Sequence, residues 1–286
     1  MEEKKQKKSG IVTLIGRSNV GKSTLLNALV GFKVSAVSPK AQTTRWAAKG
    51  VYNDERGQIV FVDTPGLFLQ VPNSLTKAVN QEVRDSIRGI DLLLYIVDPK
   101  REIGAEEKRL LSMIRSIDKK ILVINKIDTP HPKYLAEYED LVSDFDDAIK
   151  VSAKIGTHLK GLINLVFDRL KVGELLYDPN DSHDQNFNNW VAEVVREKVF
   201  HHVHQEVPYS VHVEVEEVNK RKDNTLYIKV KVFTNDERYK PMLIGAKGSK
   251  LKQIGTASRI ELELILQQKI YLDLEVEVDK HWLERV

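Results

Sequence analysis

The sequence predicts an α/β domain with a mostly parallel sheet, followed by a smaller α+β domain. The chain has 286 residues, which is enough for two domains of ordinary size. Short apolar runs alternate with amphipathic segments through roughly the first 170 residues, a pattern typical of parallel strands covered by helices on both faces. The turn-rich segment Asp178–Ser182 then interrupts this alternation and indicates a linker.

The first domain is predicted from the apolar runs and the helical periodicity between them. Strands are expected at Ile11–Ile15, Ile59–Asp63, Leu92–Asp98, Lys120–Asn125 and Ala148–Ser152. Helices are expected at Lys22–Val30, Ser74–Arg88, Glu106–Ile117, Lys133–Phe145 and Leu159–Leu170. A weaker strand candidate, Val51–Asn53, would pair antiparallel with the run that begins at Ile59.

The second domain is predicted to have the order helix, strand, strand, helix, strand. These elements are expected at Trp190–Gln205, Val211–Val218, Leu226–Phe233, Ser249–Gln268 and Tyr271–Val278. The apolar turn Met242–Ile244 and a glycine-bracketed loop precede the second helix. We therefore expect a flexible basic tail over residues 1–9, the α/β domain over 10–172, a linker over 173–187 and the α+β domain over 188–286.

Composition excludes several kinds of protein. The chain has no cysteine, so disulfide scaffolds and cysteine-ligated metal sites are ruled out, and a reducing compartment is expected. No apolar run approaches the roughly 20 residues that span a bilayer, and the charged N-terminus does not resemble a secretory signal. The predicted second domain has equal numbers of basic and acidic residues, but from Arg238 to Arg259 no acid interrupts the cations. This strip predicts local docking of an anion.

A phosphate site is predicted at Gly16–Ser23, which reads Gly-Arg-Ser-Asn-Val-Gly-Lys-Ser and matches the P-loop pattern. It follows a predicted strand and opens a predicted helix, as the motif requires. Glycines let backbone amides face a phosphate, and the helix N-terminus adds a partial positive charge. Lys22 would reach the β- and γ-phosphates, and the Ser23 hydroxyl would bind Mg²⁺.

A second motif, Asp63-Thr64-Pro65-Gly66, ends an apolar strand where a Walker B acid belongs. Asp63 would hold Mg²⁺ through water, and the amide of Gly66 would sense the γ-phosphate. Between the two motifs, the loop Ala41–Arg45 carries hydroxyls and is predicted to be a switch segment. Thr44 is the expected Mg²⁺ ligand, with Thr43 as the alternative.

The base is predicted from Asn125-Lys126-Ile127-Asp128, which follows another apolar strand. The Asp128 carboxylate can accept hydrogen bonds from guanine N1–H and the exocyclic amine, a donor pair that adenine lacks. After the next strand, Ser152-Ala153-Lys154 can offer a backbone amide to guanine O6. In this order on successive strands, the motifs predict a Ras-like P-loop GTPase domain.

The second domain is predicted to bind RNA. Gly245-Ala246-Lys247-Gly248 leads into a helix, and in KH domains such a G-x-x-G loop brings the backbone close to a single strand. Lys250, Lys252 and Arg259 on that helix could follow a phosphate backbone. The element order fits a type II KH domain. A solvated helix face is the alternative interpretation.

These motifs resemble the Era family of GTPases. The resemblance rests on Gly-Arg-Ser-Asn-Val-Gly-Lys-Ser-Thr, Ala-Gln-Thr-Thr-Arg, Asp-Thr-Pro-Gly-Leu, Asn-Lys-Ile-Asp and Ser-Ala-Lys. In the second half it continues with Arg-Glu-Lys at 196–198, Val-Pro-Tyr-Ser-Val at 207–211 and Ile-Gly-Ala-Lys-Gly at 244–248. The resemblance implies a monomeric GTPase that is cytoplasmic and partly associated with the membrane. It also implies that the protein binds 16S-type rRNA of the small subunit near its 3′ end and assists assembly of the 30S subunit.

The predicted site residues follow from the motifs and the resemblance together. Nucleotide is expected at Gly16, Asn19, Val20, Gly21, Lys22, Ser23, Thr24, Asp63, Gly66, Asn125, Lys126, Asp128, Ser152, Ala153 and Lys154. Hydrolysis is expected to use Lys22, Asn19, Thr44 and Gly66, and Mg²⁺ to bind at Ser23, Thr44 and Asp63. RNA is expected at Ile244, Gly245, Ala246, Lys247, Gly248, Lys250, Lys252 and Arg259.

Hydrolysis carries a further hypothesis. Leu67 stands where Ras-like proteins have the glutamine that orients water, so intrinsic turnover is expected to be slow. As in potassium-stimulated relatives, K⁺ held partly by Asn19 would supply the missing positive charge. The alternative role of Asn19 is to stabilise the turn.

Three other functions compete with this prediction. A P-loop kinase for a small metabolite is opposed by Asn125–Asp128 and by the apparent lack of a lid. A catalytically weak GTP-binding scaffold for RNA stays open because of Leu67, although Lys22, Ser23 and Asp63 weigh against it. A GTPase of a related ribosome or tRNA-modification family is the third.

Overall fold

The computed structural model describes residues 6–40, 43–66, 81, 83, 85–204 and 206–282. The chain divides into two compact units, and each is described by itself. Residues 1–37 and 44–184 form the first unit, and residues 38–43 and 185–286 form the second. No helix in the described ranges is both long enough and apolar enough to cross a membrane.

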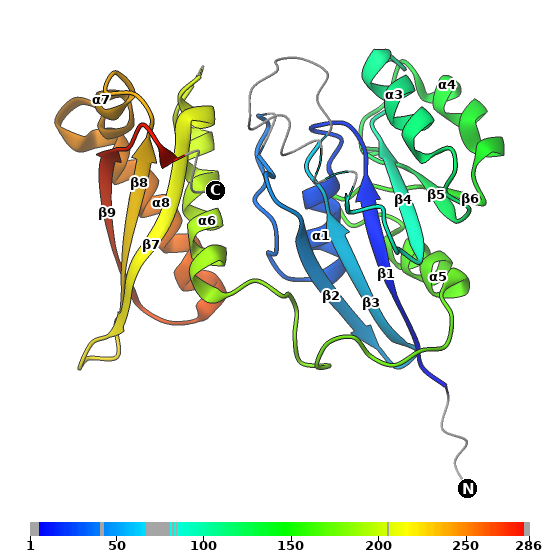
Figure 1. Ribbon diagram of the computed structural model, residues 1–286, viewed down its shortest axis with the longest axis horizontal. Helices are drawn as coiled ribbons and strands as arrows, with labels where there is room; N and C mark the ends of the chain where they lie inside the picture. The colour runs from blue at the N-terminus through cyan, green and yellow to red at the C-terminus, as the bar shows by residue number, and fades with distance from the viewer. Residues whose placement is uncertain are drawn as a thin grey trace, which may run out of the picture. The chain divides into compact units, whose positions relative to one another are not determined.

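The first unit is built on a sheet which, within the described residues, has six strands in the order β2-β3-β1-β4-β5-β6 (Figure 1). The strands are β1 (Lys8–Ile15), β2 (Ala48–Asp54), β3 (Gly57–Asp63), β4 (Leu92–Val97), β5 (Lys120–Ile124) and β6 (Asp147–Lys150). β2 runs antiparallel to β3, and the remaining neighbours are parallel. The predicted mostly parallel sheet is confirmed, including the antiparallel strand at its edge.

Two hydrophobic cores cover the two faces of this sheet. The helices and helical turn are α1 (Lys22–Val30), α3 (Ala105–Ile114), α4 (Leu135–Glu139), the 3₁₀ turn η1 (Asp140–Asp144) and α5 (Leu159–Arg169). In β4, Leu92, Leu94 and Ile96 pack with α1 and α5. Leu93, Tyr95 and Val97 pack on the other face with α3 and α4. Both side-chain rows are buried, so the strands lack polar alternation.

The predicted helix Ser74–Arg88 lies mostly outside the described residues. Residues 67–80, 82 and 84 are not described, whereas Gln81, Val83 and Asp85 are helical. The predicted helix Lys133–Phe145 is shorter than expected, because the chain passes from α4 into η1 within it.

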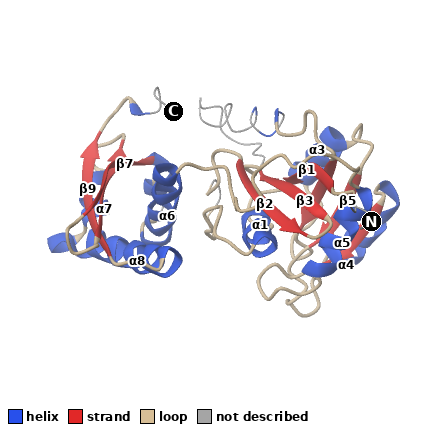
Figure 2. Cartoon of the chain, turned by 90° about the horizontal axis from the view of Figure 1, so that it is seen from below, coloured by secondary structure: helices blue, strands red, loops and turns tan. Residues whose placement is uncertain are grey.

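The second unit has, in the part of the chain that is described, a three-stranded sheet in the order β7-β8-β9. Its elements are α6 (Phe187–His202), the 3₁₀ turn η2 (Val207–Ser210), β7 (Val211–Lys220), β8 (Leu226–Thr234), α7 (Tyr239–Ile244), the 3₁₀ turn η3 (Ala246–Gly248), α8 (Ser249–Leu266) and β9 (Ile270–Val278). β7 and β8 are antiparallel, whereas β8 and β9 are parallel. Helices α6 and α8 pack on one side of the sheet (Figure 2). The expected α+β order is confirmed.

Helix α7 is a correction to the sequence interpretation. Met242–Ile244 was expected to be an apolar turn, but it forms the end of a six-residue helix that begins at Tyr239. Only Leu243 of this helix is buried, so the segment has too little apolar periodicity to indicate a helix from sequence.

Most of the segment predicted to be a linker, residues 173–187, belongs to the first unit, which extends to residue 184. The amides of Leu176 and Tyr177 donate to the side-chain oxygen of Gln58 at 2.8 and 2.9 Å, and the Gln58 amide donates to the Tyr177 carbonyl at 2.9 Å. The amide of Val51 donates to the Ser182 carbonyl at 2.9 Å. Gln58 is fully buried, so one polar side chain in β3 holds this segment against the sheet.

We expect Gln58→Leu to release the segment 175–183, because two backbone amides and one carbonyl, all partly buried, lose their partner. The cost should be about 1 kcal/mol, at the lower end of the range for an unsatisfied buried polar group, because these groups are partly exposed. Limited proteolysis should then cut this segment faster, and urea unfolding of the first unit should shift to lower concentration. Asn180→Ala, an exposed change in the same segment, is the control. Equal cleavage of Gln58→Leu and wild type would contradict this role.

Candidate functional site

Four loops that carry the predicted nucleotide motifs leave the carboxyl ends of parallel strands. The loop after β1 contains Gly16–Ser23, and the loop after β3 contains Asp63–Gly66. Asn125–Asp128 follows β5, and Ser152–Lys154 follows β6. Because these strands run parallel, their carboxyl ends share one edge of the sheet (Figure 1), where open α/β sheets bind ligands.

The carbonyl oxygens of the P-loop are bonded to donors outside the loop or at its end. The Lys22 ammonium donates to the carbonyls of Gly16 and Arg17, each at 3.1 Å. Arg101 donates to the carbonyl of Ser18 at 2.7 Å. An ammonium has three N–H donors, so Lys22 keeps one for a phosphate.

The rest of the loop is held by the guanine motif. The Lys126 ammonium donates to the carbonyl of Asn19 at 2.6 Å, and the Asn125 amide donates to the carbonyl of Val20 at 2.9 Å. In trans peptides the N–H points opposite to the C=O, and the described residues contain no cis peptide bond. The amides of this loop therefore face away from these donors, as a nest for phosphate requires.

Two glycines allow close contacts around this loop. Gly21 has φ +100°, and a Cβ there would lie 2.4 Å from the Asn125 side-chain nitrogen. A Cβ on Gly66 would lie 2.6 Å from the backbone nitrogen of Ser18. Gly66 therefore packs directly on the P-loop, next to where a γ-phosphate would bind.

Lys22 is buried in the nucleotide site, with an exposed fraction of 6%. Burial lowers the pKa of Lys22 to about 8, although the nearby Asp63 carboxylate opposes this shift. Burial also raises the pKa of Asp63, and the charge of Lys22 opposes that shift. Both charges lack the solvation that water would give them, which favours binding of a charged ligand between them.

Three oxygen atoms meet where Mg²⁺ was predicted. The Ser23 hydroxyl donates to Asp63 Oδ2 at 2.6 Å and lies 2.9 Å from the Thr44 hydroxyl, which is itself 3.5 Å from the same carboxylate oxygen. Asp63 Oδ1 is buried and has no hydrogen-bond partner among the described residues. Hard oxygen donors with an unsatisfied carboxylate fit Mg²⁺.

The two switch threonines differ in their contacts. The Thr44 hydroxyl belongs to the oxygen cluster with Ser23 and Asp63. The Thr43 hydroxyl instead donates to the carbonyl of Lys40 at 2.8 Å. This arrangement favours Thr44 over Thr43 as a metal ligand. Ala41 and Gln42 of the same loop lie outside the described residues.

The predicted guanine residues form a connected set. Asn125 is buried, and its side-chain oxygen accepts from the amide of Ala153 at 3.0 Å. The Ser152 hydroxyl donates to Asp128 at 2.7 Å, which lowers the pKa of this exposed carboxylate. Asp128 therefore stays ionised and can accept two hydrogen bonds from guanine. Lys126 pairs with Asp98 at 2.6 Å, a contact the motif did not reveal.

The remaining nucleotide residues have simpler places. Thr24 lies in the first turn of α1. Lys154 is exposed after β6. Leu67, on which the slow-hydrolysis hypothesis depends, lies outside the described residues.

The G-x-x-G segment lies between α7 and α8. Gly245 has φ +74° and ψ 173°, a region open essentially to glycine alone. Ala246–Gly248 form a single 3₁₀ turn, in which Lys247 has left-handed backbone angles. Ala246 and Lys247 are exposed, and Ile244 is half-buried.

A groove of about 380 Å³ runs along α8 and β9. It is lined by Gly248, Leu251, Lys252, Gly255, Thr256, Arg259, Leu272 and Leu274. Three predicted RNA residues, Gly248, Lys252 and Arg259, therefore line it, whereas Lys250 does not. The sequence interpretation missed its apolar side, because Leu272 and Leu274 belong to the next element, β9, and the sequence patterns do not show that its side chains line a groove with α8.

The positive charge of the basic strip, residues 238–259, is partly neutralised by an ion pair. Arg259 pairs with Glu263 at 2.7 Å, one turn further along α8. Lys252 is exposed. Charge in this groove is therefore provided mainly by Lys252, with Arg259 partly neutralised by its neighbour.

Histidines do not form a metal site in the described part of the chain. No cluster of three or more histidine or acidic side chains there could hold a metal ion. His201 and His204 are exposed and His202 is half-buried; His201 and His202 end α6, whereas His204 lies beyond it.

We expect nucleotide binding to take up protons through Lys22. A phosphate beside the ammonium favours its charged form, so the bound pKa rises above the free value of about 8. Affinity for GDP should therefore fall as pH rises through 8, and binding at pH 8 should take up roughly half a proton. Calorimetry in buffers of different ionisation enthalpy measures this uptake, with pH 6.5 as control. Zero uptake at pH 8 would contradict the assignment.

Comparisons with known proteins agree with both units. Residues 11–126 match the family model described as 50S ribosome-binding GTPase, and residues 206–283 match the KH domain model. GTPase Era of Halothermothrix orenii is 38% identical over 283 residues, covering 97% of this chain and 95% of that protein. GTPase Era of Trichlorobacter lovleyi is 39% identical, with the same coverage.

Solved Era structures have the same fold. A variant of Aquifex aeolicus Era bound to GDP·AlF4⁻ matches with a TM-score of 0.90 and 35% identity, covering 97% of this chain and 96% of that chain. A crystal structure of Era in complex with MgGDPNP and nucleotides 1506–1542 of 16S ribosomal RNA also has a TM-score of 0.90 and 35% identity, with 98% and 96% coverage. Together with the nucleotide site and the KH fold, this similarity over nearly the full length shows that the chain belongs to the Era family of GTPases.

Proposed function

We propose that this GTPase is a switch that binds 16S-type rRNA of the small subunit near its 3′ end and assists assembly of the 30S subunit. The main support is the nucleotide site together with a groove beside a G-x-x-G turn in the same chain. The Era structure with MgGDPNP and 16S rRNA nucleotides contains both kinds of ligand. The KH unit would span residues 188–286, after a GTPase domain over 10–172.

In the nucleotide site, each residue has a proposed role. Lys22 neutralises charge on the β- and γ-phosphates, and the P-loop amides bind the phosphate oxygens. The amide of Gly66, which lies against Ser18, contacts the γ-phosphate. Asp128 and a backbone amide of the segment Ser152–Lys154 recognise guanine. Asn125 holds the P-loop to this segment by bonding the carbonyl of Val20 and the amide of Ala153.

Ser23, Thr44 and Asp63 would hold Mg²⁺, which neutralises charge that develops on the phosphates during transfer. Thr44 then orders the switch segment when GTP is bound. For K⁺, the support is Asn19, which lies in the P-loop with φ +63°. Its carbonyl is bonded by Lys126, and its side chain is proposed to help hold K⁺ near the transferring phosphate.

A physical link between nucleotide and RNA is proposed through the switch segment. Thr44 belongs to the first unit, whereas residues 38–43 belong to the second. Within the second unit, Arg196 of α6 donates to the carbonyl of Thr43, and the Lys40 ammonium donates to the carbonyls of Phe200 and Val203. Because Thr43 and Thr44 are adjacent, ordering of Thr44 by nucleotide would alter the segment held on α6.

Two parts of the proposal rest on the family resemblance alone. The chain is proposed to act in the cytoplasm as a monomer. It is also proposed to associate peripherally with the inner face of the cytoplasmic membrane. Sedimentation equilibrium tests the monomeric state, which a dimer would refute. Co-sedimentation with anionic vesicles at physiological salt tests the membrane association, which is refuted if the protein stays free of the vesicles.

The central experiment measures binding of a short single-stranded RNA from the 3′ end of small-subunit rRNA. We expect tighter binding with a GTP analogue than with GDP or without nucleotide. Equal affinity in all three states would retain both binding functions but refute their coupling. No binding in any state would refute the RNA function itself.

The same assay separates the two lysines of α8. Lys252→Ala should weaken RNA binding and lower the slope of log affinity against log salt by about 0.7, the value for one phosphate contact with single-stranded nucleic acid. Lys250→Ala makes the same charge change outside the groove lining and should have a smaller effect. Equal effects of both variants would show that the groove does not direct binding.

The K⁺ hypothesis predicts faster GTP turnover in KCl than in NaCl at equal concentration, by about ten-fold or more, as for one electrostatic contact to a transition state. Asn19→Ala should abolish most of this difference. GDP affinity of the variant is the control for damage to the P-loop. Equal turnover of the wild type in both salts removes the hypothesis, and absence of turnover in both would favour a GTP-binding scaffold.

A further inference from the structure

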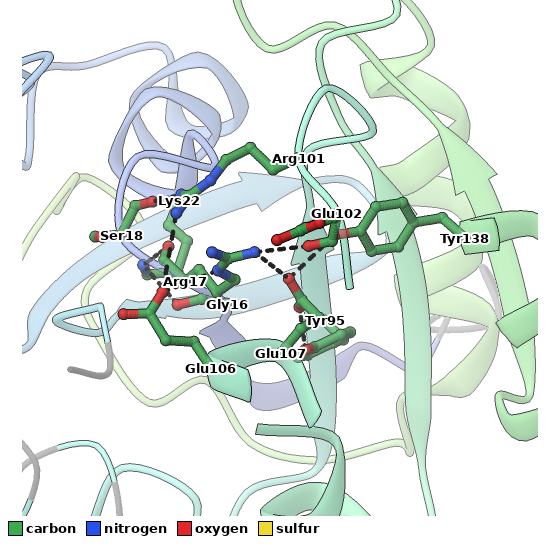
Figure 3. Close-up of polar contacts among 10 residues, drawn as sticks. All are labelled: Gly16, Arg17, Ser18, Lys22, Tyr95, Arg101, Glu102, Glu106, Glu107 and Tyr138. Atoms are coloured by element: carbon green, nitrogen blue, oxygen red, sulfur yellow. Dashed lines mark hydrogen bonds and ion pairs between the residues drawn. The ribbon is translucent and has the colours of Figure 1, made fainter. Parts of the chain in front are cut away.

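The second residue of the P-loop, Arg17, points away from the phosphate site into a cluster of carboxylates (Figure 3). Its guanidinium donates to Glu106 at 3.0 Å and to the carbonyl of Glu102 at 2.9 Å. It also lies 3.6 Å from Glu107. Glu102 lies in the segment just before α3, and Glu106 and Glu107 lie in its first turn. One arginine therefore connects the phosphate loop to this helix.

Glu107 is the buried member of this cluster. Glu107 is 0% exposed, and both of its carboxylate oxygens accept hydrogen bonds. Tyr95 donates to one oxygen, and Tyr138 donates to the other at 3.1 Å. Burial and the charge of Glu107 raise the pKa of Tyr95 well above its usual range, so this hydroxyl stays protonated and donates.

A buried carboxylate at this position is not needed to pack α3 on β4. Taking a carboxylate out of water is strongly unfavourable unless it is paired and hydrogen-bonded. Leu110 and Ile114 already pack α3 against the sheet. The partners that offset the burial of the Glu107 carboxylate are two tyrosine hydroxyls and the guanidinium of Arg17 in the P-loop. The charge of Glu107 therefore acts on the P-loop through Arg17.

Arg101 provides a second contact from the same side. It donates to the carbonyl of Ser18 at 2.7 Å and lies 3.8 Å from Glu106. The segment 101–107 therefore holds both the Arg17 side chain and the Ser18 backbone. Lys22, at the start of α1, also bonds the carbonyls of Gly16 and Arg17, so contacts from α1 and from the segment 101–107 both hold the loop.

We propose that Glu107 is a positioning residue for nucleotide binding, which acts through Arg17 and, with Arg101, keeps the P-loop in its phosphate-binding conformation. The inference rests on the proposed roles of the P-loop residues. Neither Glu107 nor Arg101 belongs to the motifs predicted to bind the nucleotide. Loss of either lets the loop sample conformations in which its amides no longer converge, so bound GDP and GTP leave faster.

The test is the dissociation rate of a fluorescent GDP from the full chain at fixed Mg²⁺. Glu107→Gln keeps the size and hydrogen-bonding atoms but removes the charge that faces Arg17. Dissociation should accelerate about ten-fold, equivalent to about 1.4 kcal/mol. KM for GTP should rise by a similar factor while kcat changes little, because the loop contacts are made in the ground state and the transition state alike.

Two controls separate positioning from general destabilisation. Leu110→Ala removes core packing from the same helix and should lower thermal stability without a comparable change in the dissociation rate. In an Arg17→Gln background, Glu107→Gln should add almost nothing to the dissociation rate, because its partner is already gone. Additive effects of the two changes, or equal acceleration by Leu110→Ala, would overturn the proposal.

Arg101→Ala decides the matter if Glu107→Gln does not fold, since Arg101 is about one-third exposed at 36%. It should accelerate GDP dissociation about three-fold without a change in thermal stability. An unchanged or slower rate of GDP dissociation would overturn the proposal, because losing the Arg101 contact would then not loosen the P-loop. RNA is absent from these assays, so failure here leaves the proposed RNA function untouched.

Discussion

Phosphate binding in this protein depends on one constraint: the carbonyl oxygens of the P-loop must be bonded on the side away from the phosphate. A loop with unpaired carbonyls would collapse toward its own amides, because buried backbone groups are almost always paired. The donors come from separate places along the chain, namely Lys22 at the start of α1, Arg101 before α3 and Asn125 with Lys126 after β5. The strand order places β1 beside β4 and β4 beside β5, so the sheet brings these donors to one loop.

The charges of the nucleotide site are incomplete by themselves. Burial lowers the pKa of Lys22 and raises the pKa of Asp63, so for both groups the environment disfavours the charged form. A phosphate beside Lys22 and a cation beside Asp63 would each reverse that penalty. A ligand that binds only the folded state also stabilises it. The same burial that weakens the free site therefore makes nucleotide binding a source of stability for the first unit.

Sequence reasoning succeeded where chemistry is local and failed where it is assembled by the fold. The P-loop, the strand ends and the KH order are continuous patterns, and the predicted strands agree with the structure to within a few residues. Arg17 and Glu107 are 90 positions apart in the chain, and nothing in either neighbourhood predicts their pairing. The groove side formed by Leu272 and Leu274 depends on how β9 packs beside α8, which the separate helix and strand patterns do not show. Gln58 lies just before the predicted strand Ile59–Asp63 and carried no predicted role, yet it binds the segment predicted to be a linker.

The nucleotide site and the proposed RNA groove would hold an anionic ligand in different ways. In the nucleotide site, a cation and a carboxylate are buried together, so affinity depends on exact placement of a few groups and little on salt. In the groove of the second unit, Lys252 is exposed and Arg259 is shared with Glu263, so its electrostatic attraction is screened by salt and modest in size. If RNA binds in this groove as proposed, backbone approach at Gly245–Gly248 and the apolar side formed by Leu251, Leu272 and Leu274 would provide much of the affinity. A single strand whose bases can reach this apolar side satisfies both requirements, whereas a duplex, with its bases stacked inside, offers the groove only phosphates.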